Sequence, residues 1–320
     1  MASTRKSPST EPTPAGLAPA LVACLDRYAQ PTDRLTVGLS GGIDSVVLLH
    51  ALATLRPAGL AAVHVHHGLS PHADHWAEFC RDFAQQLGVA CVCTRVDVER
   101  NAADGLEAAA RRARHGVFAQ FDTDWIVLAH HRDDQAETLL FNLLRGTGLA
   151  GAAAMRPRLG KLLRPLLDIG RAEIEAYAIA HGLDWVEDES NCDTRHTRNF
   201  LRHRILAPLA QRFGAAAQNL AAAAARFAEA QELLDALARL DLGGGEDFPV
   251  AVETLQALTE ARARNALRFL LSQRGVKIPN EARLREGLRQ MLEAGIDRHP
   301  AVKLGSHRLV RRRGWILIEE

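Results

Sequence analysis

The chain has 320 residues, of which 47% are hydrophobic and 24% charged, so it contains enough apolar residues to bury two globular cores. No apolar run approaches the ~20 residues that span a bilayer, and five scattered cysteines do not make a disulfide framework. The chain contains no C-x-x-C pair, which argues against a structural zinc site or an iron–sulfur cluster, and its cysteine usage favours a cytoplasmic protein.

The net charge of +1 is unevenly distributed. Residues 261–314 contain 14 Lys and Arg against 4 Asp and Glu, a local net charge of +10. A basic block on an otherwise acidic protein predicts a polyanionic partner, of which nucleic acid is the usual example. A solvated helical face remains the alternative.

Strands and helices alternate along the first half of the chain. Residues 1–16 are rich in Ser, Thr and Pro and are predicted to be a disordered tail. Apolar spacing then predicts, in order, a helix over 17–28, a strand over 35–39, a helix over 45–52, a strand over 60–66, a helix over 72–87, a strand over 89–98, a helix over 106–121, a strand over 125–129, a helix over 134–144 and a strand over 159–163. Such an α/β pattern predicts a doubly wound parallel sheet with helices on both faces, whose ligands bind at the carboxyl ends of the strands.

The pattern becomes helical from Arg198 onward, and a domain boundary is predicted near residue 214. Residues 17–214 would form the nucleotide-binding catalytic domain, and residues 215–320 a smaller, mostly helical α+β domain. In the second domain we expect helices over 215–240, 255–273 and 280–292, followed by short strands over 301–304, 307–310 and 315–318.

Two glycines and two serines follow the first strand, in the segment Ser40-Gly41-Gly42-Ile43-Asp44-Ser45. Glycine lets the backbone pass close to a ligand, and the following helix directs backbone N–H groups and a partial positive charge at this turn. The segment therefore suits an anion, most simply a phosphate group of a nucleotide.

Two other interpretations of the same turn stay open. It could be a Gly-rich strand–helix connection without a ligand, or a nucleophile elbow with Ser40 as the nucleophile of a serine hydrolase, because residues 38–42 match G-x-S-x-G. An elbow, however, normally follows several strands, whereas this turn follows the first strand of the chain.

Histidines follow the second strand, where His66, His67 and Gly68 are expected to line the nucleotide pocket. A zinc site is the alternative interpretation, but no acidic or Cys partner has clear ligand spacing.

The fourth strand is followed by His130 and then by Asp134 and Glu137, which are three residues apart and would share one face of a helix. These carboxylates could form an acidic pocket for Mg²⁺ or an ammonium group, or simply face solvent. Asp133 or Asp134 is expected to cap the helix. Arg111, on the preceding helix, could hold a phosphate, although an Ala- and Arg-rich surface helix is the simpler interpretation.

Together these motifs resemble the N-type ATP-pyrophosphatase family and, within it, the tRNA(Ile)-lysidine synthases. The resemblance covers about residues 34–210 in order, and the segment 259–318 is similar to the domain that follows the catalytic one. The matching motifs are S-G-G-x-D-S at 40–45, HHGLS at 66–70, E-A-x-A-R-x-x-R at 107–114, AHHRDDQAET at 129–138, LLRGTGLAG at 143–151, RPLL at 164–167, WVEDESN at 185–191 and TRNFLRHRI at 197–205. His115 and Ala152 depart from the family pattern, which usually has Tyr and Leu there.

The resemblance implies a ligase that adenylates the wobble cytidine of a tRNA(Ile) with a CAU anticodon and then joins free lysine to its carbon 2. ATP would bind Ser40, Gly41, Gly42, Ile43, Asp44, Ser45, His66, His67, Gly68, His130 and Gly146. The catalytic residues would be Asp44, Asp134, Glu137 and Arg111, with Asp44 also a ligand of Mg²⁺. The tRNA would contact Arg198, Arg202, Arg264 and Arg268.

Other functions remain as alternatives. They are another tRNA-modifying enzyme of the same family, such as a thiolase, a serine esterase using Ser40, and a non-catalytic RNA-binding module carried by the basic domain. The oligomeric state stays open, with a homodimer among the possibilities.

Overall fold

The computed structural model describes residues 16–56, 58–99, 101–102, 105–189, 193–295 and 298–319. Apart from Gly16, the predicted tail over 1–16 lies outside these residues. The chain forms two compact units, one that ends at Arg226 and one that begins at Phe227, so the division falls inside helix α10 (Ala216–Asp241). The boundary predicted near residue 214 lies shortly before this helix.

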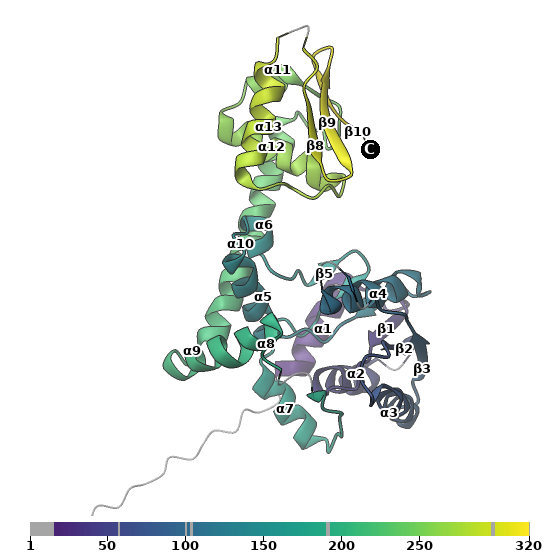
Figure 1. The fold of residues 1–320 in the computed structure, drawn as a ribbon. Coiled ribbons are helices and arrows are strands. Elements are labelled where there is room, and N and C mark those ends of the chain that lie inside the picture. Colours follow the sequence, from purple (N-terminus) through teal and green to yellow (C-terminus); the bar gives the residue numbers. More distant parts are fainter. Residues whose placement is uncertain are drawn as a thin grey trace, which may run out of the picture. The chain divides into compact units, whose positions relative to one another are not determined.

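The first unit alternates strands and helices along the chain (Figure 1). Its elements before α10 are α1 (Leu17–Tyr28), β1 (Leu35–Gly38), α2 (Ile43–Leu55), β2 (Leu60–His66), α3 (Ala73–Gln86), β3 (Ala90–Arg95), α4 (Leu106–Gln120), β4 (Trp125–Val127), α5 (Arg132–Leu144), α6 (Leu149–Ala152), β5 (Arg158–Leu159), β6 (Leu162–Leu163), α7 (Arg171–Ala180), α8 (Thr197–Phe200), the π-helical segment η3 (Leu201–Leu206) and α9 (Ala207–Arg212). No helix of the described ranges is long and apolar enough to cross a membrane.

Within these ranges six strands form one sheet in the order β3-β2-β1-β4-β6-β5. The central strand β1 pairs in parallel with β2, where Leu35 is opposite Leu60, and with β4, where Leu35 is opposite Trp125. The chain runs outward from β1 through β2 to β3 and then returns to the other side of β1. This reversal creates a crevice between the carboxyl ends of β1 and β4, which is the usual ligand site of such sheets.

The prediction of a single strand over 159–163 is wrong in one respect, because the segment forms two short strands. Gly160 has φ of +57° and turns the chain, so β5 pairs with β6 in antiparallel fashion while β6 extends the parallel sheet beside β4. Glycine adopts this left-handed conformation without the steric cost that other residues carry.

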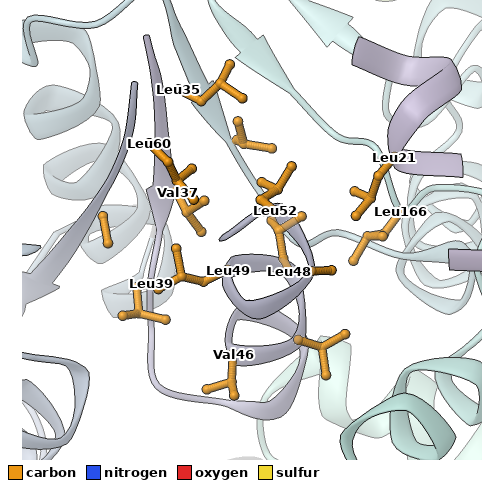
Figure 2. Close-up of a cluster of buried hydrophobic side chains, with 14 of the residues drawn as sticks. Leu21, Leu35, Val37, Leu39, Val46, Leu48, Leu49, Leu52, Leu60 and Leu166 are labelled. Carbon is orange, nitrogen blue, oxygen red and sulfur yellow. The ribbon is translucent and has the colours of Figure 1, made fainter. Parts of the chain in front are cut away.

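Helix α2 is buried on most of its surface because it lies between the sheet and other helices. Its leucines Leu48 and Leu52 lie among side chains of β1, such as Val37, and residues outside the sheet, such as Leu21 and Leu166 (Figure 2). The near-continuous apolar sequence of α2 thus reflects contacts on two sides. The opposite face of the sheet has a smaller core, which contains Phe118 of α4.

The second unit packs helices against an antiparallel sheet of four strands, in the order β7-β10-β9-β8 among the described residues. Its elements after α10 are β7 (Val250–Ala251), α11 (Val252–Gln256), α12 (Glu260–Gln273), α13 (Glu281–Glu293), β8 (Ala301–Leu304), β9 (His307–Arg312) and β10 (Trp315–Glu319). The single helix predicted over 255–273 is therefore two helices, since α12 begins after Thr259, which has extended backbone at the N-cap. Helices α6 and α7 and strand β7 had no counterpart in the sequence-based prediction.

Candidate active site

The segment Ser40–Ser45 connects β1 to α2 at the crevice in the sheet. The Ser45 hydroxyl donates to the Gly42 carbonyl at 2.9 Å and accepts from the Ser40 N–H at 3.1 Å, which fixes the loop at the helix start. Within the described residues, the N–H groups of Ile43 and Asp44 have no partner, as is usual in the first turn of a helix. The loop can therefore donate hydrogen bonds to an anion.

Gly41 is required at its position for two reasons. Its φ of +90° is unfavourable for other residues, and a Cβ there would lie 2.7 Å from Cγ2 of Val186. The Val186 N–H also donates to the Gly41 carbonyl at 3.0 Å, so the segment after α7 holds the loop from the side.

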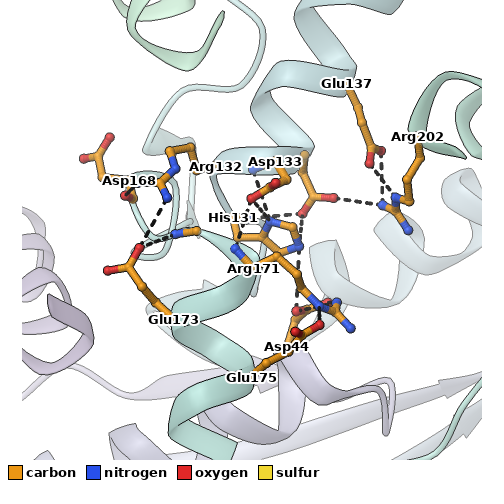
Figure 3. A network of polar contacts seen from close by, with 12 residues as sticks. Asp44, His131, Arg132, Asp133, Glu137, Asp168, Arg171, Glu173, Glu175 and Arg202 are labelled. Atoms are coloured by element: carbon orange, nitrogen blue, oxygen red, sulfur yellow. Dashed lines mark hydrogen bonds and ion pairs between the residues drawn. The ribbon is translucent and has the colours of Figure 1, made fainter. Parts of the chain in front are cut away.

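Asp44, in the first turn of α2, is held by a guanidinium from α7. Nη1 of Arg171 lies 2.9 Å from both carboxylate oxygens of Asp44, and its Nε donates to Glu175 at 2.8 Å (Figure 3). The Asp44 side chain is 29% exposed. Burial raises the pKa of the Asp44 carboxyl, while the positive charges of His131 and Arg171 act in the opposite direction.

His131 lies buried between the acidic groups at the start of α5. Its ring Nδ1 accepts from the backbone N–H of Asp133 at 3.2 Å, and the backbone N–H of His131 donates to the Asp134 carboxylate at 3.0 Å, so these residues form a reciprocal cap. The prediction that Asp133 or Asp134 occupies the N-cap is wrong, because His131 does and Asp134 is at the third helical position. The histidine accepts here in place of the usual hydroxyl or carboxylate.

The second nitrogen of His131 connects the loop to the acidic helix. Nε2 lies 3.7 Å from Asp44 Oδ1 and 3.6 Å from Asp134 Oδ2. Burial lowers the pKa of His131, but the carboxylates of Asp133, Asp134 and Asp44 outweigh burial, so the pKa is raised overall.

Asp134 and Glu137 point to a common cation, the guanidinium of Arg202. Its Nε lies 2.5 Å from Glu137 Oε1, and its Nη2 lies 3.1 Å from Glu137 Oε2 and 3.4 Å from Asp134 Oδ1 (Figure 3). Glu137 is only 4% exposed, and burial raises the pKa of its carboxyl against the opposing charge of Arg202. Two acidic side chains in this arrangement provide a pocket for a cationic group.

Arg202 comes from η3, whose hydrogen-bonding pattern is π-helical. Such short π-helical turns are often found at functional sites. The structure thus places Arg202, which was predicted to contact tRNA, against two of the predicted catalytic carboxylates.

Two neutral histidines follow β2 and β4, the strands on either side of β1. Burial, together with the charge of Arg114, lowers the pKa of His67 to about 4, and burial also lowers the pKa of His130 strongly. Nδ1 of each ring is buried without a hydrogen-bond partner in the described part of the chain. His66 instead bonds Asp74 through Nε2 at 3.1 Å, and Gly68 follows with φ of +63°.

One predicted ATP-binding residue, Gly146, lies away from this crevice. Gly146 follows the C-terminus of α5, a 13-residue helix, so about 20 Å of helix separates it from the acidic residues at the N-terminus. Arg264 and Arg268 belong to α12 in the second unit, where both form ion pairs with Glu281.

Ser40 lacks the partners of a hydrolytic nucleophile. Its hydroxyl contacts the Ser45 hydroxyl at 3.1 Å and accepts from the Gly42 N–H at 3.3 Å. Within the described residues no histidine contacts it, so the serine hydrolase interpretation gains no support from the geometry.

Arg171 and His131 were missing from the predicted site, although both contact Asp44. His131 belongs to the same HH pair as His130, so its place after a predicted strand was a usable signal. No sequence signal pointed to Arg171, because helix α7 itself was not predicted.

A strand–loop–helix turn at the switch point of a parallel sheet, beside an acidic helix, defines a nucleotide-binding domain of the PP-loop class. The PP-loop domain family matches residues 19–209, and the TilS substrate binding domain family matches residues 251–317. The chain belongs to the tRNA(Ile)-lysidine synthase family within this class, as its curated relatives show.

Two of these relatives are tRNA(Ile)-lysidine synthases of Azoarcus sp. and Alkalilimnicola ehrlichii. The first is 49% identical over 82% of this chain and 61% of its own length, and the second is 45% identical over 95% and 71%. The chain thus spans about three fifths of the length of the first of these relatives.

The fold is also similar to that of the U34-tRNA thiolase NcsA from Methanococcus maripaludis, whose solved structure contains a [4Fe-4S] cluster. The TM-score is 0.51 at 16% identity, over 66% of this chain and 78% of the thiolase. At this identity the likeness concerns the fold alone.

Proposed function

We propose that this protein forms lysidine in a tRNA(Ile) with a CAU anticodon, using ATP and free lysine. The observation that carries the proposal is the pair of carboxylates, Asp134 and Glu137, that share one cation beside Asp44 and the phosphate-binding loop. A ligase of this kind needs an anion site for ATP next to a site for the ammonium group of lysine.

In the first step, the carbonyl oxygen at carbon 2 of the wobble cytidine attacks the α-phosphorus of ATP. The bond between the α-phosphorus and the bridging oxygen breaks, and pyrophosphate leaves. The loop of Ser40–Ser45 would hold the pyrophosphate, because its N–H groups stabilise the charge that develops on the leaving group.

In the second step, the ε-amine of lysine attacks carbon 2 and AMP leaves with the carbon 2 oxygen, while the amine loses a proton. Asp134 and Glu137 would bind the lysine ammonium in place of Arg202, whose guanidinium now occupies their oxygens. His131, whose Nε2 lies between Asp44 and Asp134, would fix the orientation of both carboxylates.

The donor groups at Asp44 suit Mg²⁺, which usually binds one or two carboxylates together with substrate phosphates. Among the described residues no cluster of three or more potential ligands exists, so Asp44 would hold the ion together with the phosphates of ATP. When bound, the ion would neutralise charge on the phosphates. Asp44 would have to exchange the guanidinium of Arg171 for the ion.

The test is mass spectrometry of a tRNA(Ile) transcript with a CAU anticodon after incubation with the protein, ATP and lysine. Lysidine formation adds the mass of lysine less one water, and the reaction should release pyrophosphate and AMP in equal amounts. A tRNA(Ile) transcript whose wobble base is uridine serves as the control. If the tRNA mass stays unchanged while ATP is consumed, the chain modifies another substrate.

A further inference from the structure

Arg171 extends from the start of α7 to the carboxylate of Asp44, which the proposed function makes a ligand of Mg²⁺. Its Nη1 lies 2.9 Å from both carboxylate oxygens of Asp44, so one nitrogen of the guanidinium contacts the whole carboxylate (Figure 3). Mg²⁺ is also bound through carboxylate oxygens. Arg171 and the ion would therefore compete for the same group.

The start of α7 is fixed to the start of α5 independently of this contact. The backbone N–H of Arg171 donates to Asp133 Oδ2 at 3.0 Å. Glu173 accepts from the Gly170 N–H at 2.8 Å and lies 3.4 Å from Nη2 of Arg132. Because these bonds do not use the guanidinium of Arg171, this group could leave Asp44 while the helix stays in place.

A second carboxylate can hold the guanidinium of Arg171 when it leaves Asp44. Nε of Arg171 donates to Oε1 of Glu175 at 2.8 Å, one turn further along α7 (Figure 3). The side chain of Arg171 is 40% exposed and that of Glu175 is 50% exposed, so both have room to move. The guanidinium is thus shared between a carboxylate of the candidate site and a carboxylate outside it.

The surroundings of Asp44 explain why it needs a positive charge beside it. Its side chain is 29% exposed, and Nε2 of His131, at 3.7 Å, is shared with Asp134 at 3.6 Å. A carboxylate that is largely removed from water is unfavourable unless a cation compensates its charge. Arg171 supplies this compensation whenever a metal ion does not.

We propose that Arg171 is a displaceable counter-ion, which holds the Asp44 carboxylate at the phosphate-binding loop and yields it to Mg²⁺ when ATP binds, while Glu175 retains the guanidinium. Arg171 would thus be a positioning residue, since it acts through Asp44 and not on the substrate. The proposal rests on the ATP and Mg²⁺ sites of the proposed function, but not on its tRNA or lysine. One cation replaces another in this exchange, so removing Arg171 should favour the ion.

The test measures ATP binding by equilibrium dialysis across a series of Mg²⁺ concentrations, without tRNA or lysine. Arg171→Gln removes the competing charge, so half-maximal ATP binding should need roughly tenfold less Mg²⁺, as for loss of a hydrogen bond between charged groups. Glu175→Gln removes the second carboxylate, so the guanidinium should hold Asp44 more tightly and half-maximal binding should need roughly two- to fivefold more Mg²⁺. Arg171→Lys keeps the charge and should stay closer to wild type than Arg171→Gln.

Arg132→Gln is the matched control, because it removes a guanidinium from the same junction of α5 and α7. That guanidinium contacts Asp168 and Glu173 instead of Asp44. The Mg²⁺ concentration for half-maximal ATP binding should therefore equal that of wild type. If Arg171→Gln does not fold, the expected increase in Glu175→Gln decides, and an unchanged value there would overturn the proposal.

Thermal unfolding provides a second measurement, which an arginine with a merely structural role would not change. Without ligands Arg171→Gln should melt below wild type, and this difference should shrink at saturating ATP and Mg²⁺, because wild type has then given up the same contact. An equal difference with and without ligands would overturn the proposal, since Arg171 would only stabilise the fold.

A larger difference with ligands, together with weaker ATP binding, would also overturn the proposal, because Arg171 would then contact the phosphates. The expected shifts in a protein that forms no lysidine would support this role of Arg171 and count against the proposed ligation. Lysidine formation with unshifted Mg²⁺ values would do the reverse.

Discussion

Asp44 is the residue on which most contacts of the candidate site converge. Its carboxylate accepts from Arg171, lies near Nε2 of His131 and belongs to the first turn of α2. A negative charge at a helix N-terminus is stabilised by the helix dipole, yet it would also compete with phosphate for the same N–H groups. A Mg²⁺ ion held by Asp44 would neutralise charge on the phosphates and so remove this conflict.

Asp44→Asn should abolish lysidine formation while leaving the fold intact, because asparagine keeps the size of the side chain but not its charge. Loss of preorganised charge stabilisation typically lowers the rate by ~10²–10³. The measurement is single-turnover lysidine formation, with circular dichroism as the check on folding. Near-normal ligation by a folded variant would remove Asp44 from the mechanism.

Glu137→Gln should raise the KM for lysine more than the KM for ATP, since the buried carboxylate would lose its charge opposite the ammonium group. Burial raises the pKa of Glu137 above the usual value of about 4.3, so the wild-type carboxylate loses its charge at a higher pH than an exposed glutamate. The KM for lysine should therefore increase as the pH falls through this raised pKa.

The pH dependence of Glu137→Gln should be flatter, because no proton is bound or released at this position. Glu78→Gln, which changes an exposed carboxylate on α3, is the matched control and should behave as wild type. An unchanged lysine KM with weaker ATP binding would indicate that the carboxylates serve a metal ion instead.

At the scale of elements, the site depends on how strand ends and helix starts are fixed. The loop after β1 is held by serine hydroxyls and by the backbone of Val186, and the start of α5 by the reciprocal cap of His131 and Asp134. In both cases polar side chains satisfy backbone groups that would otherwise lack partners. The geometry of the loop should therefore be sensitive to small steric changes.

Gly41→Ala should destabilise the protein and weaken ATP binding, because the new methyl group meets Val186 and the residue has φ of +90°. A left-handed conformation alone costs roughly 1–2 kcal/mol for a residue other than glycine. Thermal unfolding and ATP titration measure the two effects.

The matched control is Gly42→Ala, since Gly42 has φ of −72° and the nearest atom to a new Cβ is 3.6 Å away. Its melting temperature should stay within about one degree of wild type, because alanine adopts this conformation freely. If Gly41→Ala and Gly42→Ala have the same melting temperature, the contact with Val186 does not constrain the loop.

At the scale of the whole molecule, the basic charge of the second unit is largely paired within the unit. Arg264 forms ion pairs of 2.7 Å with Glu260 and 2.8 Å with Glu281, and Arg268 also pairs with Glu281. The Arg264 side chain is 15% exposed, but the carboxylates of Glu260 and Glu281 are 65% and 51% exposed, so phosphates could reach the arginines by replacing these carboxylates. The proposed tRNA contacts at Arg264 and Arg268 thus depend on an exchange of partners.

The double variant Arg264→Gln/Arg268→Gln should weaken tRNA binding and reduce its logarithmic salt slope by about 1.4 to 1.8, the value for two phosphate contacts. The rate at saturating tRNA should stay unchanged, because these residues would contribute affinity and not chemistry. Filter binding across a salt series and single-turnover ligation measure the two quantities.

Arg289→Gln is the control for this variant, since Arg289 pairs at 2.7 Å with Glu286 and Glu293 of its own helix and was not among the predicted tRNA contacts. Equal salt slopes for the double variant, the control and wild type would show that the basic block is a solvated face.

The sequence alone determined the features that depend on neighbouring residues. Apolar spacing predicted the alternating strands and helices of the first unit, and the glycines and serines at 40–45 predicted the phosphate-binding turn. These predictions succeed because the spacing of apolar residues and the residue types that favour turns are local properties of the chain. The short antiparallel β5 and the separate helices α11 and α12 were missed, because single turns at Gly160 and Thr259 interrupt otherwise continuous apolar patterns.

The tertiary structure decided which distant side chains meet at the crevice. Arg171 and Asp44 are 127 positions apart in the chain, and Arg202 and Glu137 are 65 apart. No local pattern records such pairs, since they arise only when the strand order places β4 beside β1 and packing brings α7 and η3 to their ends.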